Sequence, residues 1–397
     1  MTADLLTTTI RPYPWGSTTA LAELAGRPPS GEPEAELWMG AHPGAPSSID
    51  RGQGSEALDA VIDRDPHHEL GDRVTARFGP RLPFLLKLLA ADHALSVQVH
   101  PTAEQAVAGY TAENAAAVPL DAPHRIYRDR SHKPELICAL GDFDALCGFR
   151  DPRATATLWQ RLALPLLGPW IHELRTAPAE HALRTVLTAA LADDRARGEQ
   201  IAAQLPSVLA ALAEGDNSEA ATWAAYRDAA LDYPGDPGIL AAMLLNHVRL
   251  RPGQALYLDA GVPHAYLRGL GVEIMANSDN VLRCGLTPKH VDTAALAAVV
   301  DFRPTAPQHV PAVPAGPGEL EFLTPAEEFS LSRIELGEPV RIADDGPQIL
   351  LCVRGTARIE GGPSLTPGRS AYLPAGDGPV QLTGEATLFR AKVPQPR

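Results

Sequence analysis

The sequence has 397 residues, of which 45% are hydrophobic and 21% are charged, and its formal net charge is −14. This length favours two or three domains, and the composition is typical of a soluble protein with ample core material. The acidic balance argues against a nucleic-acid-binding protein and against binding to an anionic membrane, since both need a basic face. We therefore expect a small molecule as partner, which can still be anionic if a few cations converge in one pocket.

Four cysteines lie within apolar runs, and none forms a CxxC pair: Cys138, Cys147, Cys284 and Cys352. This pattern is typical of buried free thiols in a reducing compartment. The first residues show no basic segment followed by an apolar core, and no run approaches the roughly 20 apolar residues of a membrane span. We expect a cytoplasmic protein.

Residues 1–150 combine short extended runs with turn signals about every ten residues, which predicts an all-β domain with a few short helices. The texture changes in residues 151–235, which are rich in Ala and Leu with apolar positions three and four residues apart. This spacing predicts a helical insertion that the breakers in DYPGDPG close. Strand-like texture then returns in residues 236–308.

A sequence segment within residues 236–308 has a similar counterpart near the C-terminus, and we call the two segments the repeated phrase. RLRPGQALYLDAGVPHAY resembles LTPGRSAYLPAGDGPVQL, but Pro379 and Val380 stand where Pro263 and His264 stand in the first copy. The repetition predicts two β-barrels of related design, of which only the first carries polar ligands. The Pro-rich residues 309–319 are expected to link the first barrel to a metal-free C-terminal domain, residues 309–397.

Metal-binding side chains appear in three separated islands. In SVQVHP (96–101) strand alternation puts Ser96, Gln98 and His100 on one face and the two valines on the other. The other islands supply Glu135, in SHKPEL, and His264, in GVPHAY. Two imidazoles, a carboxylate and an amide oxygen suit a divalent ion such as zinc with one open position.

The neighbours of these islands leave some alternatives open. Pro134 favours an extended conformation at Lys133, so Lys133 and Glu135 are expected to share a side. His132 is an alternative ligand but lies on the opposite face by alternation, and we rank it lower. His42 and the remaining histidines are interpreted as structural, and Trp38 and Met39 as core residues between sheets.

Seven motifs, taken together, resemble type I mannose-6-phosphate isomerase, a zinc enzyme of the cupin superfamily. The motifs follow the order of that family over most of residues 10–290: YPWGS (13–17), ELWMGAHP (36–43), LPFLLKLL (82–89), LSVQVHP (95–101), HKPEL (132–136), GVPHAY (261–266) and SDNVLRCGLTPK (278–289). The resemblance implies a mainly β fold with a helical insertion: two cupin-like jelly-roll barrels plus an α-helical domain. It also implies one zinc ion per chain and a sugar phosphate, mannose 6-phosphate or fructose 6-phosphate, as partner; we expect a monomer.

The resemblance assigns roles to individual residues of this sequence. It implies that Gln98, His100, Glu135 and His264 are the zinc ligands and that Arg283 is the catalytic arginine. The remaining residues that it places in the active site are two lysines and two acidic residues: Lys87, Lys133, Glu273 and Asp279. We add Ser96 and Tyr266 as candidates for substrate binding, since they share a side with Gln98 and His264 respectively.

Interconverting an aldose and a ketose phosphate moves a proton between C1 and C2 through an enediol. We favour Lys133 as base or relay, because burial would lower its pKa, and keep Glu273, Asp279 and His132 as alternatives. Lys87, Lys133 and Arg283 are candidates for holding the phosphate, whereas Lys289 is interpreted as a solvated turn residue.

Two other classes of protein fit part of the pattern. A two-His-one-carboxylate set is also the ligand set of non-haem iron oxygenases, but Gln98 as fourth ligand and the nearby cations argue against an oxygenase. A non-catalytic sugar-binding or storage cupin would not need Arg283 and Lys133. We therefore predict an isomerase.

Overall fold

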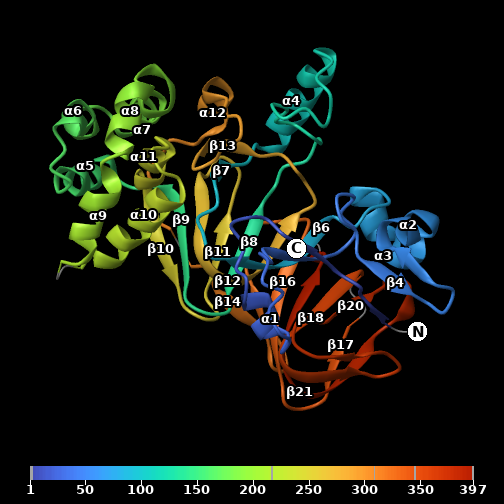
Figure 1. Ribbon diagram of the computed structural model, residues 1–397. Coiled ribbons are helices and arrows are strands. Elements are labelled where there is room, and N and C mark those ends of the chain that lie inside the picture. The colour runs from blue at the N-terminus through green and yellow to red at the C-terminus, as the bar shows by residue number, and fades with distance from the viewer. Residues whose placement is uncertain (1–2, 216–217, 308, 344–345, 396–397) are drawn as a thin grey trace.

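The computed structural model describes residues 3–215, 218–307, 309–343 and 346–395. These residues form two large β-sheets and a block of helices beside the first sheet (Figure 1). The expected mainly β fold with a helical insertion is therefore confirmed. None of the helices in the described ranges is long and apolar enough to cross a membrane.

The first sheet carries all the candidate metal ligands on or next to its strands. It has ten strands: β2 (Thr9–Arg11), β3 (Glu36–Met39), β6 (Phe84–Ala91), β7 (Val97–Val99), β8 (Glu135–Ala139), β9 (Phe143–Phe149), β10 (Leu245–Leu250), β11 (Ala255–Leu258), β12 (His264–Ala276) and β13 (Leu282–Gly285). β12 pairs with β6, β7, β8 and β9, so it joins the parts of the chain that precede and follow the helical block.

Strand alternation gives β6 one face for the core and one for the site. All eight of its residues are buried, and Leu86 and Leu88 belong to a core shared with the second sheet. Leu85, Lys87 and Leu89 point to the opposite side, where other clusters lie. A single lysine in an apolar run therefore faces the interior of the first sheet.

β12 contains an irregularity that changes which side chains face the interior. Tyr266 packs in the interior cluster, yet further along the strand Val272 and Ile274 belong to the core shared with the second sheet. The register shifts between Tyr266 and Arg268, which is typical of a β-bulge. Gly269 follows with φ of +132°, and a Cβ at that position would lie 2.6 Å from the Phe143 ring.

The helical block packs on the outer face of the first sheet. It contains α5 (Pro152–Gln160), η1 (Pro165–Leu167), α6 (Gly168–Thr176), α7 (Ala179–Thr188), η2 (Ala189–Asp193), α8 (Arg195–Ala202), α9 (Leu205–Ala213), α10 (Ala220–Asp232) and α11 (Gly238–Met243). The Asp151 side chain caps α5 by accepting from the backbone N–H groups of Arg153 and Ala154. The breakers DYPGDPG interrupt the block rather than close it, because α11 begins at their last glycine.

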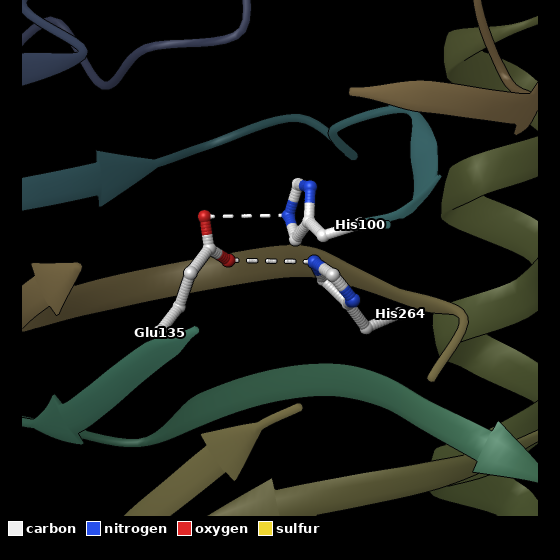
Figure 2. Close-up of side chains that lie close together, drawn as sticks. All are labelled: His100, Glu135 and His264. Carbon is white, nitrogen blue, oxygen red and sulfur yellow. Dashed lines mark ion pairs between the residues drawn. The ribbon is translucent and has the colours of Figure 1, made fainter. Parts of the chain in front are cut away.

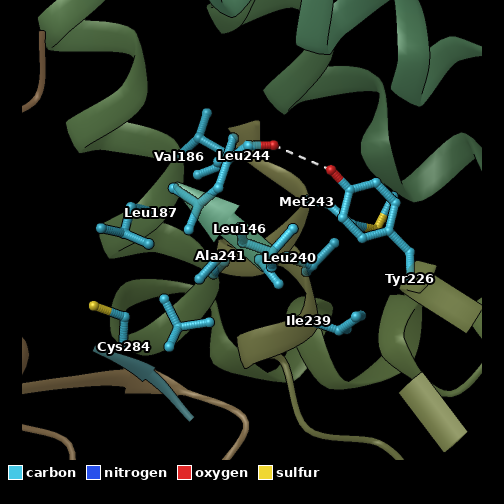
Figure 3. Packing of buried hydrophobic residues seen from close by; sticks show 14 of the residues in the cluster. Leu146, Val186, Leu187, Tyr226, Ile239, Leu240, Ala241, Met243, Leu244 and Cys284 are labelled. Atoms are coloured by element: carbon cyan, nitrogen blue, oxygen red, sulfur yellow. Dashed lines mark hydrogen bonds between the residues drawn. The ribbon is translucent and has the colours of Figure 1, made fainter. Parts of the chain in front are cut away.

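The core of this block includes residues of the sheet. Figure 3 shows Leu146 of β9 and Cys284 of β13 among side chains of α7, α10 and α11. Val97 and Val99 of β7 belong to the same cluster, so Gln98 between them points to the opposite, inner side.

Within the described ranges the second sheet has nine strands, and one of its faces packs against the first sheet. Its strands are β1 (Asp4–Leu5), β14 (Ala312–Gly316), β15 (Glu319–Phe322), β16 (Ser330–Leu336), β17 (Val340–Ile342), β18 (Gln348–Ile359), β19 (Ser364–Leu365), β20 (Ser370–Leu373) and β21 (Val380–Lys392). Phe329, Leu351 and Phe389 contribute to the core shared with the first sheet, and Ile334 and Leu388 to a separate interior cluster.

Two expectations about the ends of this sheet were wrong. The Pro-rich residues 309–319 do not form a free linker, because β14 lies within them and pairs with β15. β1 pairs with β20 of the second sheet and does not join β2 and β3 in the first. β14 is a short strand at the edge of this sheet, and such a strand tolerates proline because the N–H groups on its outer side need no partner.

The repeated phrase has the same succession of elements in both sheets. In the first copy β11 is followed by a turn and by His264, the first residue of β12. In the second, β20 is followed by η3 (Ala375–Asp377) and by Val380, the first residue of β21. Val380 is buried among apolar residues where the first copy has an imidazole.

The remaining elements lie outside the two large sheets, and β4 and β5 among them pair with each other. They are α1 (Ala20–Leu24), β4 (Ser48–Asp50), β5 (Ser55–Ala57), α2 (Leu58–Arg64), α3 (Pro66–Phe78), α4 (Ala103–Ala115) and α12 (Thr293–Val299). α2 and α3 lie beside the second sheet in Figure 1, and Tyr372 of β20 donates a hydrogen bond to the Glu69 carbonyl in α3.

Candidate active site

Three side chains from distant segments meet in the interior of the first sheet. His100 directly follows β7, Glu135 begins β8 and His264 begins β12. Their ligand atoms lie within 4.8 Å of one another, and all three residues are buried. Figure 2 shows the two imidazoles facing the carboxylate: His100 Nε2 lies 3.4 Å from Glu135 Oε1, and His264 Nε2 lies 3.4 Å from Glu135 Oε2.

Both imidazoles are oriented by a backbone carbonyl on their other nitrogen. His100 Nδ1 lies 2.9 Å from the Asn280 oxygen, and His264 Nδ1 lies 2.9 Å from the Val262 oxygen. A carbonyl only accepts, so each Nδ1 carries the proton and each Nε2 of a neutral ring presents a lone pair. This is the arrangement that holds a histidine as a metal ligand.

The contacts with Glu135 suit a shared cation. His100 Nε2 is buried without a hydrogen-bond partner, and burial lowers the pKa of His100 to about 4, so its ring is neutral near pH 7. Two acceptors then face each other at 3.4 Å. Ligand atoms that are 2.0–2.2 Å from a tetrahedral zinc ion lie roughly 3.3–3.6 Å apart, so the residues fit such an ion.

Glu135 is suited to bind a cation, because its carboxyl group is ionised. Burial alone would raise its pKa, but the positive charge of Lys133 opposes burial, and the pKa is lowered well below its ordinary value. Lys133 Nζ lies 2.9 Å from Glu135 Oε1, and only 8% of Lys133 is exposed. The two residues therefore share a side, as expected from Pro134.

Gln98 and Arg283 lie in a row with His264. Gln98 is the direct cross-strand partner of His264 on β12 and of Arg283 on β13. Directly paired residues point to the same face of a sheet, with Cβ atoms roughly 4.5–5.5 Å apart. Gln98 and Arg283 therefore lie on the face of the sheet that carries His264.

Lys87 and Glu273 form a buried ion pair beside this row. Lys87 Nζ lies 3.0 Å from Glu273 Oε2 and 3.6 Å from Glu36 Oε1. Burial alone would lower the pKa of Lys87, but the charges of Glu273, Glu36 and Glu135 raise it. Burial raises the pKa of Glu273, which Lys87 opposes only in part.

Trp38 belongs to this network and is not only a core residue. Trp38 Nε1 donates to Glu36 Oε2 at 2.7 Å, and Lys87 Nζ lies 5.4 Å from the centre of the indole ring. Met39, which points to the other side, is a core residue as expected. Trp38 therefore holds Glu36 next to the lysine.

Asp279 is paired with His42, a histidine that we had interpreted as structural. The backbone N–H of Gly44 donates to His42 Nδ1 at 3.0 Å, so the proton of a neutral ring is on Nε2. His42 Nε2 lies 3.4 Å from Asp279 Oδ1. Burial opposes ionisation of Asp279, but His42, with the charges of Lys133 and Arg128, lowers the pKa of this carboxyl.

Two further cations, Arg128 and Lys289, lie near Arg283. Burial and the nearby charge of Arg128 lower the pKa of Arg283. Burial also lowers the pKa of Lys289, as do the charges of Arg283 and Arg128. Lys289 is exposed and lies in a bend, as expected of a solvated turn residue, but the charges of the two arginines show that it also lies near them.

The remaining candidates lie at the borders of the site. Ser96 is half-buried and precedes Gln98 by two residues in an extended segment. The Tyr266 hydroxyl is buried close to Glu273, and burial raises its pKa well above the ordinary value, yet it makes no hydrogen bond of ordinary geometry. His132 Nε2 lies 2.7 Å from Glu328 Oε1 of the C-terminal part, away from the cluster of His100, Glu135 and His264.

Sequence reasoning missed four residues that the structure connects to the site: Glu36, His42, Arg128 and Asn280. Glu36 had a usable signal, because it alternates with Trp38 on a strand next to Lys87. Asn280 contributes a backbone oxygen, for which no residue type is diagnostic.

Comparisons with known proteins bear on the whole chain. Residues 5–152 match the family model of the phosphomannose isomerase type I catalytic domain, and residues 318–393 match that of the mannose-6-phosphate isomerase cupin domain. The mannose-6-phosphate isomerase of Escherichia coli (strain K12) is 39% identical over 394 residues, which cover 97% of this chain and 98% of that protein. This chain belongs to the type I phosphomannose isomerase family.

More distant relatives and solved structures agree with this membership. Mannose-6-phosphate isomerase 2 of Arabidopsis thaliana is 31% identical over 419 residues, covering 97% of this chain and 92% of that protein. A zinc-bound crystal structure of mannose 6-phosphate isomerase has a TM-score of 0.90 at 37% identity, with 100% of both chains covered. A lysine-to-alanine variant of phosphomannose isomerase from Salmonella typhimurium gives the same TM-score, identity and coverage.

Proposed function

We propose that this protein is a zinc-dependent aldose-ketose isomerase that interconverts mannose 6-phosphate and fructose 6-phosphate by proton transfer through an enediol. The observation that carries the proposal is the pair of imidazoles, each fixed by a carbonyl on Nδ1 and each facing a different oxygen of Glu135 with Nε2. Membership of the family and the zinc-bound relative support it.

Zinc fits the residues present. Two neutral imidazoles and one carboxylate are typical zinc ligands, and the Gln98 amide oxygen is our candidate for the fourth. Lewis-acid stabilisation of negative charge on the sugar oxygens is the chemistry that zinc supplies when bound, and it is worth several kcal/mol.

The proton moves between two adjacent carbons, which requires a group that both accepts and donates it. Our candidates are Lys133 and Glu273, which are buried and border the metal site. The raised pKa of Glu273 brings a carboxyl closer to neutral pH, where an acid-base catalyst works best. Lys87 holds Glu273 in place by their ion pair, and Tyr266 lies beside it.

Protons also have to be moved at the sugar oxygens when the ring opens and at the enediol. Asp279 is our candidate for this step, since half of its side chain is exposed and His42 fixes one carboxylate oxygen. Ser96, next to Gln98 on the extended segment, is our candidate for a hydrogen bond to the substrate.

The phosphate needs cations that are not already neutralised. Arg283, Lys289 and Arg128 are our candidates, because the charge of Arg128 lowers the pKa of Arg283 and the charges of both arginines lower the pKa of Lys289. Lys87 and Lys133 are less suited than we expected, since both contact buried carboxylates. Arg283 is also the cross-strand partner of Gln98, our candidate metal ligand. We therefore propose that Arg283 lies between the phosphate and the reacting carbons of the substrate.

We further propose that the chain forms two cupin-like jelly-roll barrels. Residues 1–150 without β1 and the strands of residues 236–308 make the catalytic barrel, and the helical block, which includes α11, is inserted in it. Residues 309–397 make a metal-free barrel to which β1 is added. The cupin-domain match and the repeated succession of strands support this division. Four buried cysteines without disulfides support a cytoplasmic location.

The deciding experiment is a coupled assay of mannose 6-phosphate conversion on the purified protein. We expect activity that is lost after treatment with a chelator and restored by zinc but not by magnesium. Full activity in protein that contains no metal, or oxygen-dependent turnover in iron-loaded protein, would contradict the proposal. Size-exclusion chromatography of the same sample tests the expected monomer.

A further inference from the structure

A fully buried asparagine lies behind the metal site. Asn280 is 0% exposed, and its amide uses both ends. Its Oδ1 accepts from the backbone N–H groups of Arg128 at 2.7 Å and Asp129 at 3.2 Å, and its Nδ2 donates to the carbonyls of Asp129 and Ser131, each at 2.9 Å. A buried amide with all these partners holds the two chain segments in one relative position.

The carboxylate of Asp129 strengthens the same connection. It accepts from Ser131 N at 2.8 Å, from Asp279 N at 2.8 Å and from Ser278 Oγ at 2.9 Å. Ser278 is 1% exposed. Residues Asp129, Ser131, Ser278 and Asn280 thus form one hydrogen-bonded group, which we call the Asp129–Asn280 cluster.

The cluster reaches two of the three segments that supply the metal ligands. The backbone oxygen of Asn280 accepts from His100 Nδ1 at 2.9 Å and so fixes the direction of that imidazole. Ser131, whose carbonyl is held by Ser278 and Asn280, lies just before Lys133 and Glu135 in the chain. His264 differs, because its Nδ1 is bound by Val262 of its own turn.

We infer that the Asp129–Asn280 cluster is a positioning device for the metal centre, which aligns His100 with Glu135 and thereby sets how long the ion stays bound. This inference rests on the proposed zinc site. Without the side chain of Asn280, its backbone loses four anchors, and the carbonyl that fixes His100 Nδ1 can shift. The Nε2 lone pair then points less accurately at the ion, and partners of this kind change metal affinity by about 10- to 100-fold.

The test is the rate at which zinc leaves the full-length zinc-loaded protein, measured by transfer to an excess of a chromogenic chelator. We expect Asn280→Ala to release zinc about 10- to 100-fold faster than the wild type. Asn277→Ala is the matched control, because the Asn277 amide donates only to the Leu82 carbonyl and has no bond to the cluster. Its zinc release is expected to stay within about twofold of the wild type, since it is no partner of a ligand.

Other results would overturn the inference. A wild-type rate in Asn280→Ala would do so, as would an equal acceleration in both variants, which indicates a general loosening of the fold. If Asn280→Ala does not fold, Ser278→Ala is the second variant, because it removes the hydroxyl that contacts Asp129, Ser131 and Asn280 N. It is expected to accelerate release several-fold, and a wild-type rate in that variant has the same meaning. Wild-type protein that binds no zinc would instead refute the proposed function.

Discussion

Lys87 Nζ donates to Glu273 Oε2 at 3.0 Å in a place where both side chains are buried. The single lysine of an apolar strand is thus the counter-ion of two glutamates, Glu273 and Glu36, and not a side chain that extends to the surface. A buried charge without its partner is costly, so this pair allows a sharp prediction.

Replacing Lys87 with Met leaves two buried carboxylates without a cation. We expect Lys87→Met to lower the free energy of unfolding by about 3–5 kcal/mol, as measured by urea unfolding. The double variant Lys87→Met/Glu273→Gln removes both charges of the pair and is expected to regain part of that loss. Additive losses in the two single variants would contradict a direct interaction between Lys87 and Glu273.

Replacing Gln98 with Glu tests the fourth ligand. With a neutral amide, two neutral imidazoles and one carboxylate, a bound zinc ion keeps a net charge near +1, and a second carboxylate in place of the amide would cancel it. We expect Gln98→Glu to retain zinc but to lower kcat, measured with zinc content on the same sample. An unchanged kcat would count against the electrophilic role of the ion, and Gln98→Leu, which offers no ligand atom, is expected to bind zinc more weakly.

Asp279 is expected to act in proton transfer, with His42 as its positioning partner. Asp279→Asn should lower kcat by about 10²- to 10⁴-fold if the carboxylate transfers a proton in the reaction. His42→Phe keeps a ring against Trp38, which it contacts edge-on, but removes the donor to Asp279, so we expect a smaller loss of kcat. Wild-type kcat in Asp279→Asn would exclude the carboxylate from the chemistry.

Lys289 is expected to contribute to binding of the phosphate. Lys289→Met should raise KM for mannose 6-phosphate by about tenfold, the loss of one charge-assisted hydrogen bond, and should change kcat little. Lys392→Met is the control, because Lys392 lies 3.6 Å from Glu321 in the second sheet. Equal KM values in the two variants and the wild type would remove Lys289 from the site.

The contact between His132 and Glu328 predicts a pH-dependent stability. Glu328 raises the pKa of His132 against the effect of burial, and Asp259 and Glu104 add to this, whereas His132 lowers the pKa of Glu328. The stabilisation that protonated His132 contributes is fully present below the unfolded pKa of histidine, about 6.5, and is lost as the pH rises through the higher pKa of the folded state. The stabilisation that ionised Glu328 contributes is lost only as the pH falls through the lowered pKa of this carboxyl.

Glu328→Gln should therefore destabilise the protein at about pH 6 by about 1 kcal/mol, a value reduced by the partial exposure of His132, and have little effect at about pH 9. Urea unfolding at the two pH values measures this difference. Glu327→Gln serves as control, since Glu327 pairs with Arg77 and not with a histidine. An equal loss at both pH values in Glu328→Gln would show that the pair does not act through the charge of His132.

Strand periodicity in the sequence predicted the direction of part of the site, and the resemblance to a family joined that part to Glu135 and His264. Alternation in SVQVHP predicted that Gln98 points away from the two valines, and the packing of those valines against the helical block agrees with this. The resemblance to a family added Glu273 and Asp279, which no periodicity indicates. The helical insertion was visible because its apolar spacing differs from that of the strands.

Other relationships depend on tertiary structure and had no local signal. The pairing of β3 with β6 brings Glu36 to Lys87, and the proximity of His42 to Asp279 arises from loops that are far apart in the chain. The strand character of the Pro-rich residues was hidden because an edge strand tolerates proline where a central strand does not. The cluster around Asn280 acts largely through backbone groups, which every residue type possesses.

The bulge after Tyr266 has a consequence for how this strand can change. Because side chains alternate, removing one residue between Tyr266 and Gly271 would turn Glu273 toward the hydrophobic core and put Val272 and Ile274 in the catalytic interior. A deletion there would thus exchange the lining of the reaction chamber for that of the core, although no catalytic group would be removed. We therefore expect the number of residues in this short segment of β12 to be more constrained than the identity of most of them.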